Sequence, residues 1–288
     1  MLSWKIGAVT VTRVVESNFS VPAGSEGFLP LATPEALRKS PWLYPDFVTE
    51  DEVMQMSVHA LLVEAPGMRL VVDTCVGNDK VRDDWATLST DFLKDLAALG
   101  WSRESVDAVV CTHLHFDHVG WNTMLVDGEW VPTFPNARYL IGRKEFEHWS
   151  AEPDEDNQRV LADSVRPVLD AGLAEFVDLD QRISPEIRLV PSTGHTPGHV
   201  SVRIESGGEV AVITGDMTHH PFQLAHPDWS LRFDSDPNAA AATRQRLFAE
   251  WADESVLVIG THYPTPTAGR VRRDGAAFRL ETQVHVDA

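Results

Sequence analysis

The stretch His113-Leu114-His115-Phe116-Asp117-His118 decides how this chain of 288 residues is interpreted. Three histidines and one aspartate fall within six positions, although the whole chain has only 12 histidines. At these frequencies chance would produce the arrangement somewhere in such a chain in roughly 0.2% of cases. Neutral imidazole and carboxylate are ligands that divalent zinc accepts. The stretch therefore predicts a metal site.

The apolar run before this motif indicates where the metal would lie. Residues 106–112, VDAVVCT, are typical of a strand that is buried on both faces. Where the chain leaves that strand, the alternate residues His113 and His115 can face one point. Asp117 and His118, on the next turn, can face a second point nearby. The spacing predicts two neighbouring metal positions at the end of one strand.

Six residues are too few to hold two ions, and three remote residues can complete the set. His195 lies in the sequence GHTPGH at 194–199. Asp216 ends the apolar run VAVITGD, and His262 ends the apolar run VLVIGTH. Each ligand-type residue stands at or near the point where a buried strand meets a loop, and loops of this kind carry functional groups.

Strand-like and helix-like runs alternate along the rest of the chain. Strands are expected at residues 4–15, 57–65 and 69–74, helices at 89–99 and 237–251, and a late hairpin with its turn at Asp274-Gly275. No linker interrupts this order, so residues 1–288 are expected to form one layered α/β domain. Residues 17–55 are irregular and rich in proline. They form either a lid, pocket wall or subunit contact, or a surface wrap packed on its own aromatic side chains.

The bulk composition excludes several classes of function. The net charge of −19 repels phosphate backbones and anionic membranes, so neither nucleic acid nor a membrane is expected as a partner. The two cysteines, Cys75 and Cys111, make no disulfide framework. The first residues lack the pattern of a signal peptide, and no run approaches the roughly 20 apolar residues that span a membrane. A cytoplasmic protein is expected.

The quoted motifs together resemble the metallo-β-lactamase fold superfamily. THLHFDHVGW, GHTPGH, the pair Gly215-Asp216 and the late His262 occur in the order of that family, over about residues 55–265. The resemblance implies a four-layer αβ/βα sandwich with two metals at one edge between the sheets. The first metal would be held by His113, His115 and His195, the second by Asp117, His118 and His262, and both by a bridging Asp216.

Further residues are expected around these ligands. Asp73, which follows the run RLVV, either orients a ligand histidine or caps a turn. His199 is expected to brace the GHTPGH loop by hydrogen bonds. Four aromatic residues either line an apolar substrate pocket or pack in the core: Trp42, Phe116, Trp121 and Phe222.

Two neighbouring metals that share a hydroxide imply hydrolysis. Within the superfamily the chain resembles N-acyl-homoserine lactonases and the methyl-parathion-hydrolase-like enzymes, whose ending is similar to THYPTPTAGRVRRDG here. We therefore expect a zinc-dependent hydrolase of lactones or other carboxylic esters, with manganese, iron or cobalt as alternative metals, acting as a homodimer. A hydrolase of phosphotriesters or aryl esters is the first alternative. A metal-binding module without catalysis is the second.

Position 219 departs from the lactonase pattern. In many acyl-homoserine lactonases a tyrosine stands three residues after the bridging aspartate, whereas this chain has His219. His219 is expected to act in catalysis by donating a hydrogen bond to the substrate. The alternative is that it shapes its loop or contacts a metal. Asp117 is expected to serve both as a ligand and in catalysis.

Overall fold

The N-terminal half of the chain builds a seven-stranded sheet in the computed structural model, which describes residues 1–82 and 86–282. The strand order is β1-β2-β3-β4-β5-β8-β9. The strands are β1 (Ser3–Ile6), β2 (Val9–Pro22), β3 (Val53–Ala65), β4 (Met68–Val72), β5 (Ala108–Cys111), β8 (Arg138–Gly142) and β9 (Ala174–Val177). The pairs from β1 to β4 are antiparallel, and those from β4 to β9 are parallel.

The C-terminal half builds a six-stranded sheet in chain order. Its strands are β10 (Ile187–Pro191), β11 (Val200–Ser206), β12 (Glu209–Ile213), β13 (Leu257–Ile259), β14 (Ala268–Asp274) and β15 (Ala277–Glu281). Only β12 and β13 pair in parallel. A separate hairpin consists of β6 (Thr123–Val126) and β7 (Glu129–Pro132).

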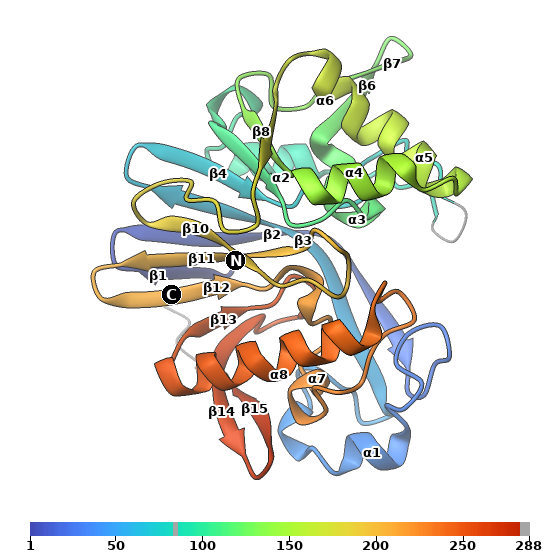
Figure 1. The fold of residues 1–288 in the computed structure, drawn as a ribbon, viewed down its shortest axis with the longest axis vertical. Coiled ribbons are helices and arrows are strands. Elements are labelled where there is room, and N and C mark those ends of the chain that lie inside the picture. Colours follow the sequence, from blue (N-terminus) through green and yellow to red (C-terminus); the bar gives the residue numbers. More distant parts are fainter. Residues whose placement is uncertain (83–85, 283–288) are drawn as a thin grey trace.

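Helices cover the outer face of each sheet, so the molecule has four layers (Figure 1). The first sheet is covered by α2 (Phe92–Ala98), α3 (Phe116–Val119), α4 (Arg143–Ala151), α5 (Glu155–Val160), the π-helical turn η4 (Leu161–Val165) and α6 (Arg166–Asp170). The second sheet is covered by α1 (Pro34–Arg38), α7 (Phe222–Ala225) and α8 (Pro237–Glu254). Four 3₁₀ turns complete the helical segments: η1 (Pro41–Leu43), η2 (Arg103–Ser105), η3 (Gly120–Asn122) and η5 (Gly215–Met217). The expected αβ/βα sandwich is confirmed.

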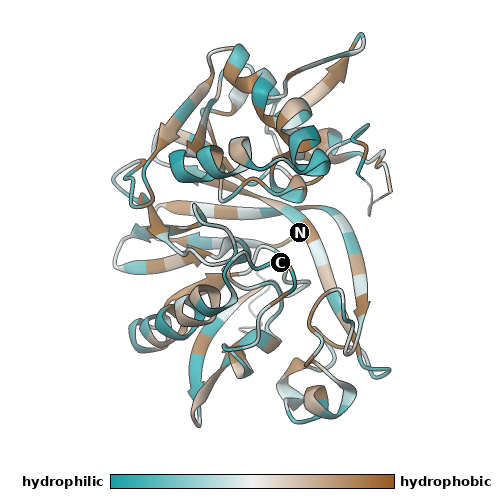
Figure 2. Cartoon of the chain, turned by 45° about the vertical axis from the view of Figure 1, so that its right-hand side comes forward, coloured by the Kyte–Doolittle hydropathy of each residue, from teal (hydrophilic) through white to brown (hydrophobic). Residues whose placement is uncertain are grey.

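Side chains that alternate along the strands create the cores between these layers. In β5, Ala108 and Val110 face the core between the two sheets, whereas Val109 and Cys111 face the helices. The side chains of β12 alternate in the same way: Ile213 faces the core between the sheets, and Val212 faces α8. Apolar residues on both faces explain why these strands read as unbroken hydrophobic runs (Figure 2). Since both sheets share the middle core, we propose that they form one domain.

The expected helices and hairpin are present with small changes at their ends. The helix expected at residues 89–99 is α2. Gly100, which follows it, has a φ of +78°, a conformation that glycine adopts without strain. Helix α8 begins where expected, because the side chain of Asp236 accepts hydrogen bonds from the backbone N–H groups of Asn238 and Ala239. The late hairpin joins β14 to β15, with Asp274 paired to Ala277.

Residues 17–55 are less irregular than expected. Strand β2 continues to Pro22, and β3 begins at Val53, so only residues 23–52 lie outside the sheet. The prediction missed the end of β2 for two reasons. A β-bulge shifts its register between Val15 and Ser17, and the run of three polar residues at 16–18 interrupts the alternation there. The remaining loop packs on its own apolar side chains and on the second sheet.

A buried group of charges ties residues 80–82 to the helices. The side chain of Asp163 in η4 pairs with Arg82 through two hydrogen bonds of 2.7 and 2.9 Å, and its Oδ1 lies 3.5 Å from Nζ of Lys80. The Lys80 ammonium also lies 3.5 Å from the centroid of the Trp130 ring. One carboxylate thus faces two cations. Burial lowers the pKa of Lys80 to about 7, although Asp163 opposes this shift.

This lowered pKa predicts how stability depends on pH. Between pH 7 and the ordinary value of 10.5, the unfolded chain keeps the Lys80 proton that the folded chain releases. The free energy of unfolding should therefore rise with pH in this window, by at most about 1.4 kcal/mol per pH unit. Urea unfolding of Lys80→Met at pH 7 and pH 9 should show a smaller rise than the native chain. The exposed Lys144→Met serves as the control, and an identical rise in all three proteins would contradict the prediction.

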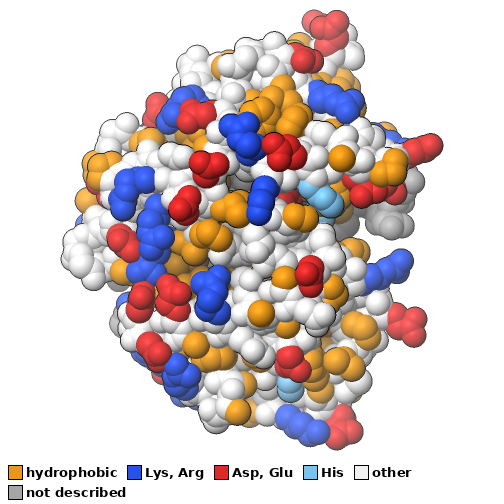
Figure 3. Space-filling view, in the orientation of Figure 1, with side chains coloured by type: hydrophobic (Ala, Val, Ile, Leu, Met, Phe, Trp, Pro, Cys, Tyr) orange, Lys and Arg blue, Asp and Glu red, His pale blue; other side chains and the backbone are white. Residues whose placement is uncertain are grey.

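Acidic and basic side chains are mixed on the face of the molecule seen in Figure 3, with apolar residues scattered between them. Among the residues that the structure describes, none of the helices is long and apolar enough to cross a membrane.

Candidate metal centre

The predicted ligands come from different segments that meet at one edge between the two sheets. His113 and His115 follow the end of β5, and His118 lies in the short helix α3. Asp216 lies in η5 directly after β12, and His262 follows β13. His195 lies in the loop between β10 and β11. Parallel pairing of β4, β5 and β8 in one sheet, and of β12 and β13 in the other, brings these strand ends to the same side.

Three histidines and Asp216 form the first group of donor atoms. Nδ1 of His115 lies 3.0 Å from Nε2 of His113 and 3.0 Å from Nε2 of His195. Oδ2 of Asp216 lies 3.8 Å from Nε2 of His113 and 3.6 Å from Nε2 of His195. His113 and His195 are buried, whereas His115 is half-buried.

Asp117, His118 and His262 form the second group. Nε2 of His118 lies 3.3 Å from Nε2 of His262. The carboxylate of Asp117 reaches both rings, with Oδ1 at 3.7 Å from His118 and Oδ2 at 3.5 Å from His262. Asp117 is half-buried, so this group is partly exposed to solvent.

Asp216 lies between the two groups. Its Oδ2 is 3.2 Å from Nε2 of His118, and its Oδ1 is 3.2 Å from Nε2 of His262. Oδ1 is buried and has no hydrogen-bond partner among the described residues. A buried carboxylate oxygen without a partner is costly unless something else neutralises it.

The donor set fits divalent metal ions. Nitrogen ligands 2.0–2.1 Å from a tetrahedral zinc lie about 3.3 Å from one another. The nitrogen separations of 3.0–3.3 Å between the histidines of each group match this spacing. All of the donor atoms in each group lie within 4.8 Å of one another. The unpartnered oxygen of Asp216 would gain its partner from such an ion.

Burial and charge set the protonation of the centre. Burial lowers the pKa of His113 and of His115 well below the ordinary value, so both rings are neutral, as metal ligation requires. Burial also opposes the charged form of His118, but the carboxylates of Asp216, Asp73 and Asp117 outweigh it and raise the pKa of this histidine. Burial would raise the pKa of Asp216, yet the imidazoles around it hold that pKa well below its usual range. Asp216 is therefore ionised.

Asp73 contacts a predicted ligand, as expected for a residue that orients it. Its Oδ2 lies 2.9 Å from Nδ1 of His118. The same carboxylate accepts hydrogen bonds from the backbone N–H and the hydroxyl of Thr112, both at 2.8 Å. Asp73 itself has a φ of +56°, and this left-handed turn after β4 accompanies the placement of its side chain beside α3.

His199 braces the centre from the GHTPGH loop. Its Nδ1 lies 2.8 Å from the Ser192 hydroxyl, and its Nε2 accepts a hydrogen bond of 2.8 Å from the backbone N–H of Asp216. Gly215 makes this approach possible, because a Cβ there would lie 2.6 Å from Nε2 of His199. The bracing contact thus links the GHTPGH loop to the residue that lies between the two groups.

Two contacts to the ligands were not predicted. Oδ1 of Asp234 lies 3.0 Å from Nδ1 of His195, and the Ser57 carbonyl oxygen lies 3.0 Å from Nδ1 of His262. Asp234 is buried and also faces the guanidinium of Arg244 at 3.4 Å. No periodic pattern surrounds Asp234 in the sequence, and a backbone carbonyl carries no residue signature. Each of these groups fixes the orientation of one imidazole.

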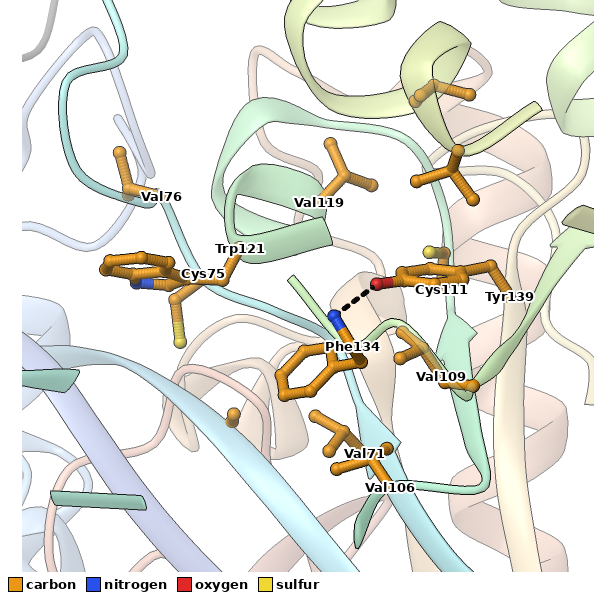
Figure 4. Packing of buried hydrophobic residues seen from close by; sticks show 14 of the residues in the cluster. Val71, Cys75, Val76, Val106, Val109, Cys111, Val119, Trp121, Phe134 and Tyr139 are labelled. Carbon is orange, nitrogen blue, oxygen red and sulfur yellow. Dashed lines mark hydrogen bonds between the residues drawn. The ribbon is translucent and has the colours of Figure 1, made fainter. Parts of the chain in front are cut away.

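The four aromatic residues considered for a substrate pocket occupy different environments. Trp121 is buried in the core under the first sheet (Figure 4). Its ring stacks on the ring of Phe92, with the two centroids 5.7 Å apart. Phe222 is fully buried in the core under the second sheet. For both residues the structure corresponds to core packing, because they fill the space between a sheet and its helices. Phe116 and Trp42 are half-buried at the edges of these cores.

The loop at residues 23–52 contacts His219 through Phe28, which was not among the predicted pocket residues. The ring of Phe28 meets the ring of His219 edge-on at 6.1 Å. The backbone carbonyl of Phe47, further along this loop, faces Nε2 of His220 at 3.0 Å. The loop therefore lies beside the histidines.

His219 lies against both groups of donor atoms. Its Nε2 is 2.9 Å from Oδ2 of Asp216, and its ring centroid is 4.8 Å from that of His195 and 5.6 Å from that of His262. Its Nδ1 is buried and has no hydrogen-bond partner among the described residues. Burial lowers the pKa of His219, although Asp216 opposes the shift, so the ring is neutral and carries one N–H.

A four-layer α/β sandwich with imidazole and carboxylate donors at the edge between its sheets defines a class, the metal-binding hydrolases. The sequence matches the model of the metallo-beta-lactamase superfamily over residues 54–262. The chain belongs to this superfamily, and it is a hydrolase whose histidine and aspartate cluster is able to bind metal.

Curated relatives carry a more specific name. An N-acyl homoserine lactonase from Bacillus sp is 25% identical over 232 residues, which cover 75% of this chain and 84% of that protein. An N-acyl homoserine lactonase from Bacillus cereus is 29% identical over 170 residues, covering 58% of this chain and 60% of that protein. The chain therefore resembles lactonases within its superfamily.

Solved structures share the whole fold. The hydrolase AbOPH of the beta lactamase superfamily superposes with a TM-score of 0.81 and 23% identity, over 98% of this chain and 97% of that chain. AidC, a dizinc quorum-quenching lactonase with a bound product, superposes with a TM-score of 0.80 and 22% identity, over 99% and 98% of the two chains. At these identities the likeness shows the fold.

Replacing the residue between the two groups tests the centre directly. Asp216→Ala removes the one carboxylate that faces histidines of both groups, so two cations would lack their shared ligand. We expect the variant to lose at least one metal ion per chain while it keeps its fold. Elemental analysis and circular dichroism of protein purified without chelator measure the two effects. Asp180→Ala, an exposed position, is the control, and native metal content in Asp216→Ala would contradict the assignment.

Proposed function

We propose that the protein binds two divalent metal ions and hydrolyses lactones or other carboxylic esters. The observation that carries the proposal is the carboxylate of Asp216, which lies near imidazole nitrogens of both groups. Its Oδ2 is 3.6 Å from Nε2 of His195 in the first group, and its Oδ1 is 3.2 Å from Nε2 of His262 in the second. The lactonases among the curated relatives support the choice of a lactone or ester as the substrate. Zinc is the metal that we propose, because imidazole nitrogens dominate both groups.

The chain would hold the ions as the two groups suggest. His113, His115 and His195 would bind one ion, and Asp117, His118 and His262 the other, with Asp216 shared. Bound in this way, two divalent ions supply an activated water as nucleophile and a Lewis acid for the ester carbonyl. No serine or cysteine nucleophile is needed for this chemistry.

The side chains around the centre would keep the ligands in position during turnover. Asp73 holds His118 through its second ring nitrogen, and Asp234 holds His195 in the same way. Such carboxylate partners raise the basicity of an imidazole ligand and restrain its ring. Asp117 lies at the half-buried side of the centre, so its carboxylate is the ligand that we propose to meet the substrate and the proton released from water.

We propose that His219 donates a hydrogen bond to the substrate. Its buried Nδ1 has no partner among the described residues, and its ring lies next to those of His195 and His262. The neutral ring has one proton, which faces Asp216 from Nε2 here, so donation to the substrate requires the tautomer with that proton on Nδ1. An Nδ1–H can stabilise charge that develops on the carbonyl or leaving oxygen. Phe28, whose ring edge meets His219, would give the substrate an apolar contact beside this donor.

A panel of substrates tests the proposed reaction. The metal-loaded protein, with close to two ions per chain by elemental analysis, should open acyl-homoserine lactones and simple lactones and cleave aryl esters. The panel also contains a phosphotriester of the paraoxon type. Faster turnover of the phosphotriester than of every ester would replace the proposed substrate class. A fully loaded protein that turns over none of these compounds would be a metal-binding module.

Substitution of His219 tests the proposed donor. His219→Ala should keep its metal and lose kcat by about 10²–10³, the usual cost of one donor to a developing oxyanion. KM should change little, because the contact is made in the transition state. His219→Tyr, which restores a donor at this position, should recover part of the rate. Unchanged kcat at full metal content would remove His219 from the reaction, and lost metal would make it a ligand.

Three further expectations stay predictions: zinc as the resident metal, assembly as a homodimer and a cytoplasmic location. Metal analysis of the protein from its native cells, light scattering and cell fractionation would test them in turn.

A further inference from the structure

Glu145 is a buried acid next to the metal centre for which neither the sequence analysis nor the proposed reaction gives a role. It lies in the first turn of α4, and only 1% of its surface is exposed. Burying an ionised carboxylate is costly unless hydrogen bonds compensate for the lost water. The contacts of its two oxygens therefore indicate what the residue does.

The two oxygens of Glu145 bind different loops. Oε1 accepts hydrogen bonds from the backbone N–H of Leu114 at 3.3 Å and from Nε1 of Trp149 at 2.6 Å. Oε2 accepts a hydrogen bond from the backbone N–H of Gly198 at 2.8 Å. Leu114 lies between His113 and His115. Gly198 lies in the GHTPGH loop, three residues after His195.

The glycine in this loop allows the close approach. A Cβ at position 198 would lie 2.4 Å from the backbone nitrogen of Glu145, so any other residue would push the loop away from α4. Trp149 extends the contact, because the indole that donates to Glu145 also meets the ring of His115 edge-on at 5.3 Å. His115 is the half-buried histidine of the first group, and the Trp149 ring packs against it.

We propose that Glu145 is a positioning residue that ties the loop carrying His113 and His115 to the loop carrying His195. The two loops belong to different sheets, and the first group of donor atoms exists only where they meet. One carboxylate that accepts on both sides sets the separation of the three imidazoles. The expected effect on metal binding rests on the proposed function. The contact between the two loops does not depend on a bound metal.

The chemistry of a carboxylate explains why an acid is needed. Ionised oxygens accept hydrogen bonds on both sides, whereas an amide of the same shape accepts on one side and donates on the other. In Glu145→Gln, an amide oxygen kept toward Leu114 and Trp149 would turn the NH₂ group toward the N–H of Gly198. Two donors would then face each other, and the link to the GHTPGH loop would be lost.

Hydrogen exchange on the full chain as purified tests the link itself. The amide of Gly198 should exchange at least about tenfold faster in Glu145→Gln than in the native chain, because it loses its hydrogen bond, whereas the amide of Leu114 keeps a weaker acceptor and should change less. Glu147→Gln is the matched control, since it makes the same change at an exposed position on α4. Equal exchange at both amides in the two variants would overturn the proposal.

Zinc competition with a chromogenic chelator tests the consequence for the metal centre. Loss of a residue that positions metal ligands usually lowers the affinity for the metal by about 10–100-fold. We expect this loss for one of two bound ions in Glu145→Gln, and none in Glu147→Gln. A role in folding alone would lower the melting temperature and leave zinc affinity unchanged, which would also overturn the proposal.

A second variant covers the case in which Glu145→Gln does not fold. Glu145→Asp keeps the charge but is one methylene shorter, so it cannot reach both loops at once. It should show fast exchange at one of the two amides and weakened zinc at one site, and native behaviour in both would contradict the inference. Failure of the proposed reaction would look different. The native chain would then bind zinc and protect both amides from exchange, and it would cleave no ester.

Discussion

The centre depends on one carboxylate that faces imidazoles on two sides. Asp216 follows a strand of the second sheet and meets His118 from the first sheet and His262 from its own. The surrounding imidazoles hold the pKa of Asp216 low, so its carboxylate is ionised. A negative charge is thus buried among imidazole nitrogens that can bind a cation. The proposed metal ions would balance this charge on both sides, which would explain why so many histidines lie together in an apolar setting.

Support for these groups comes from residues that act through hydrogen bonds. Asp73 and Asp234 each hold one imidazole, His199 holds the backbone of Asp216, and Glu145 joins two loops from different sheets. The contact of Glu145 crosses the boundary between the two halves of the molecule, whereas the other three act within one half. The four layers therefore do more than bury apolar surface, because they bring strand ends of two sheets to one edge and keep them there.

Much of this arrangement could be predicted from the sequence, and the exceptions have physical reasons. Unbroken apolar runs end at His113, Asp216 and His262, so the first polar residues after them had to lie at a sheet edge. The end of β2 was missed because a bulge shifts its alternation at a run of three polar residues. Asp234 and Glu145 were missed because their contacts join residues 39 and 53 positions apart. An aromatic residue near a motif, such as Trp121, fits a core and a pocket equally well from sequence.

Anomalous X-ray diffraction at the zinc edge, on crystals of protein loaded with zinc, tests the central claim most directly. Two peaks about 3.5–4 Å apart are predicted, one on each side of the Asp216 carboxylate. One peak should lie among His113, His115 and His195, and the other among Asp117, His118 and His262. A single peak, or peaks away from Asp216, would contradict a centre in which this carboxylate joins two metal ions.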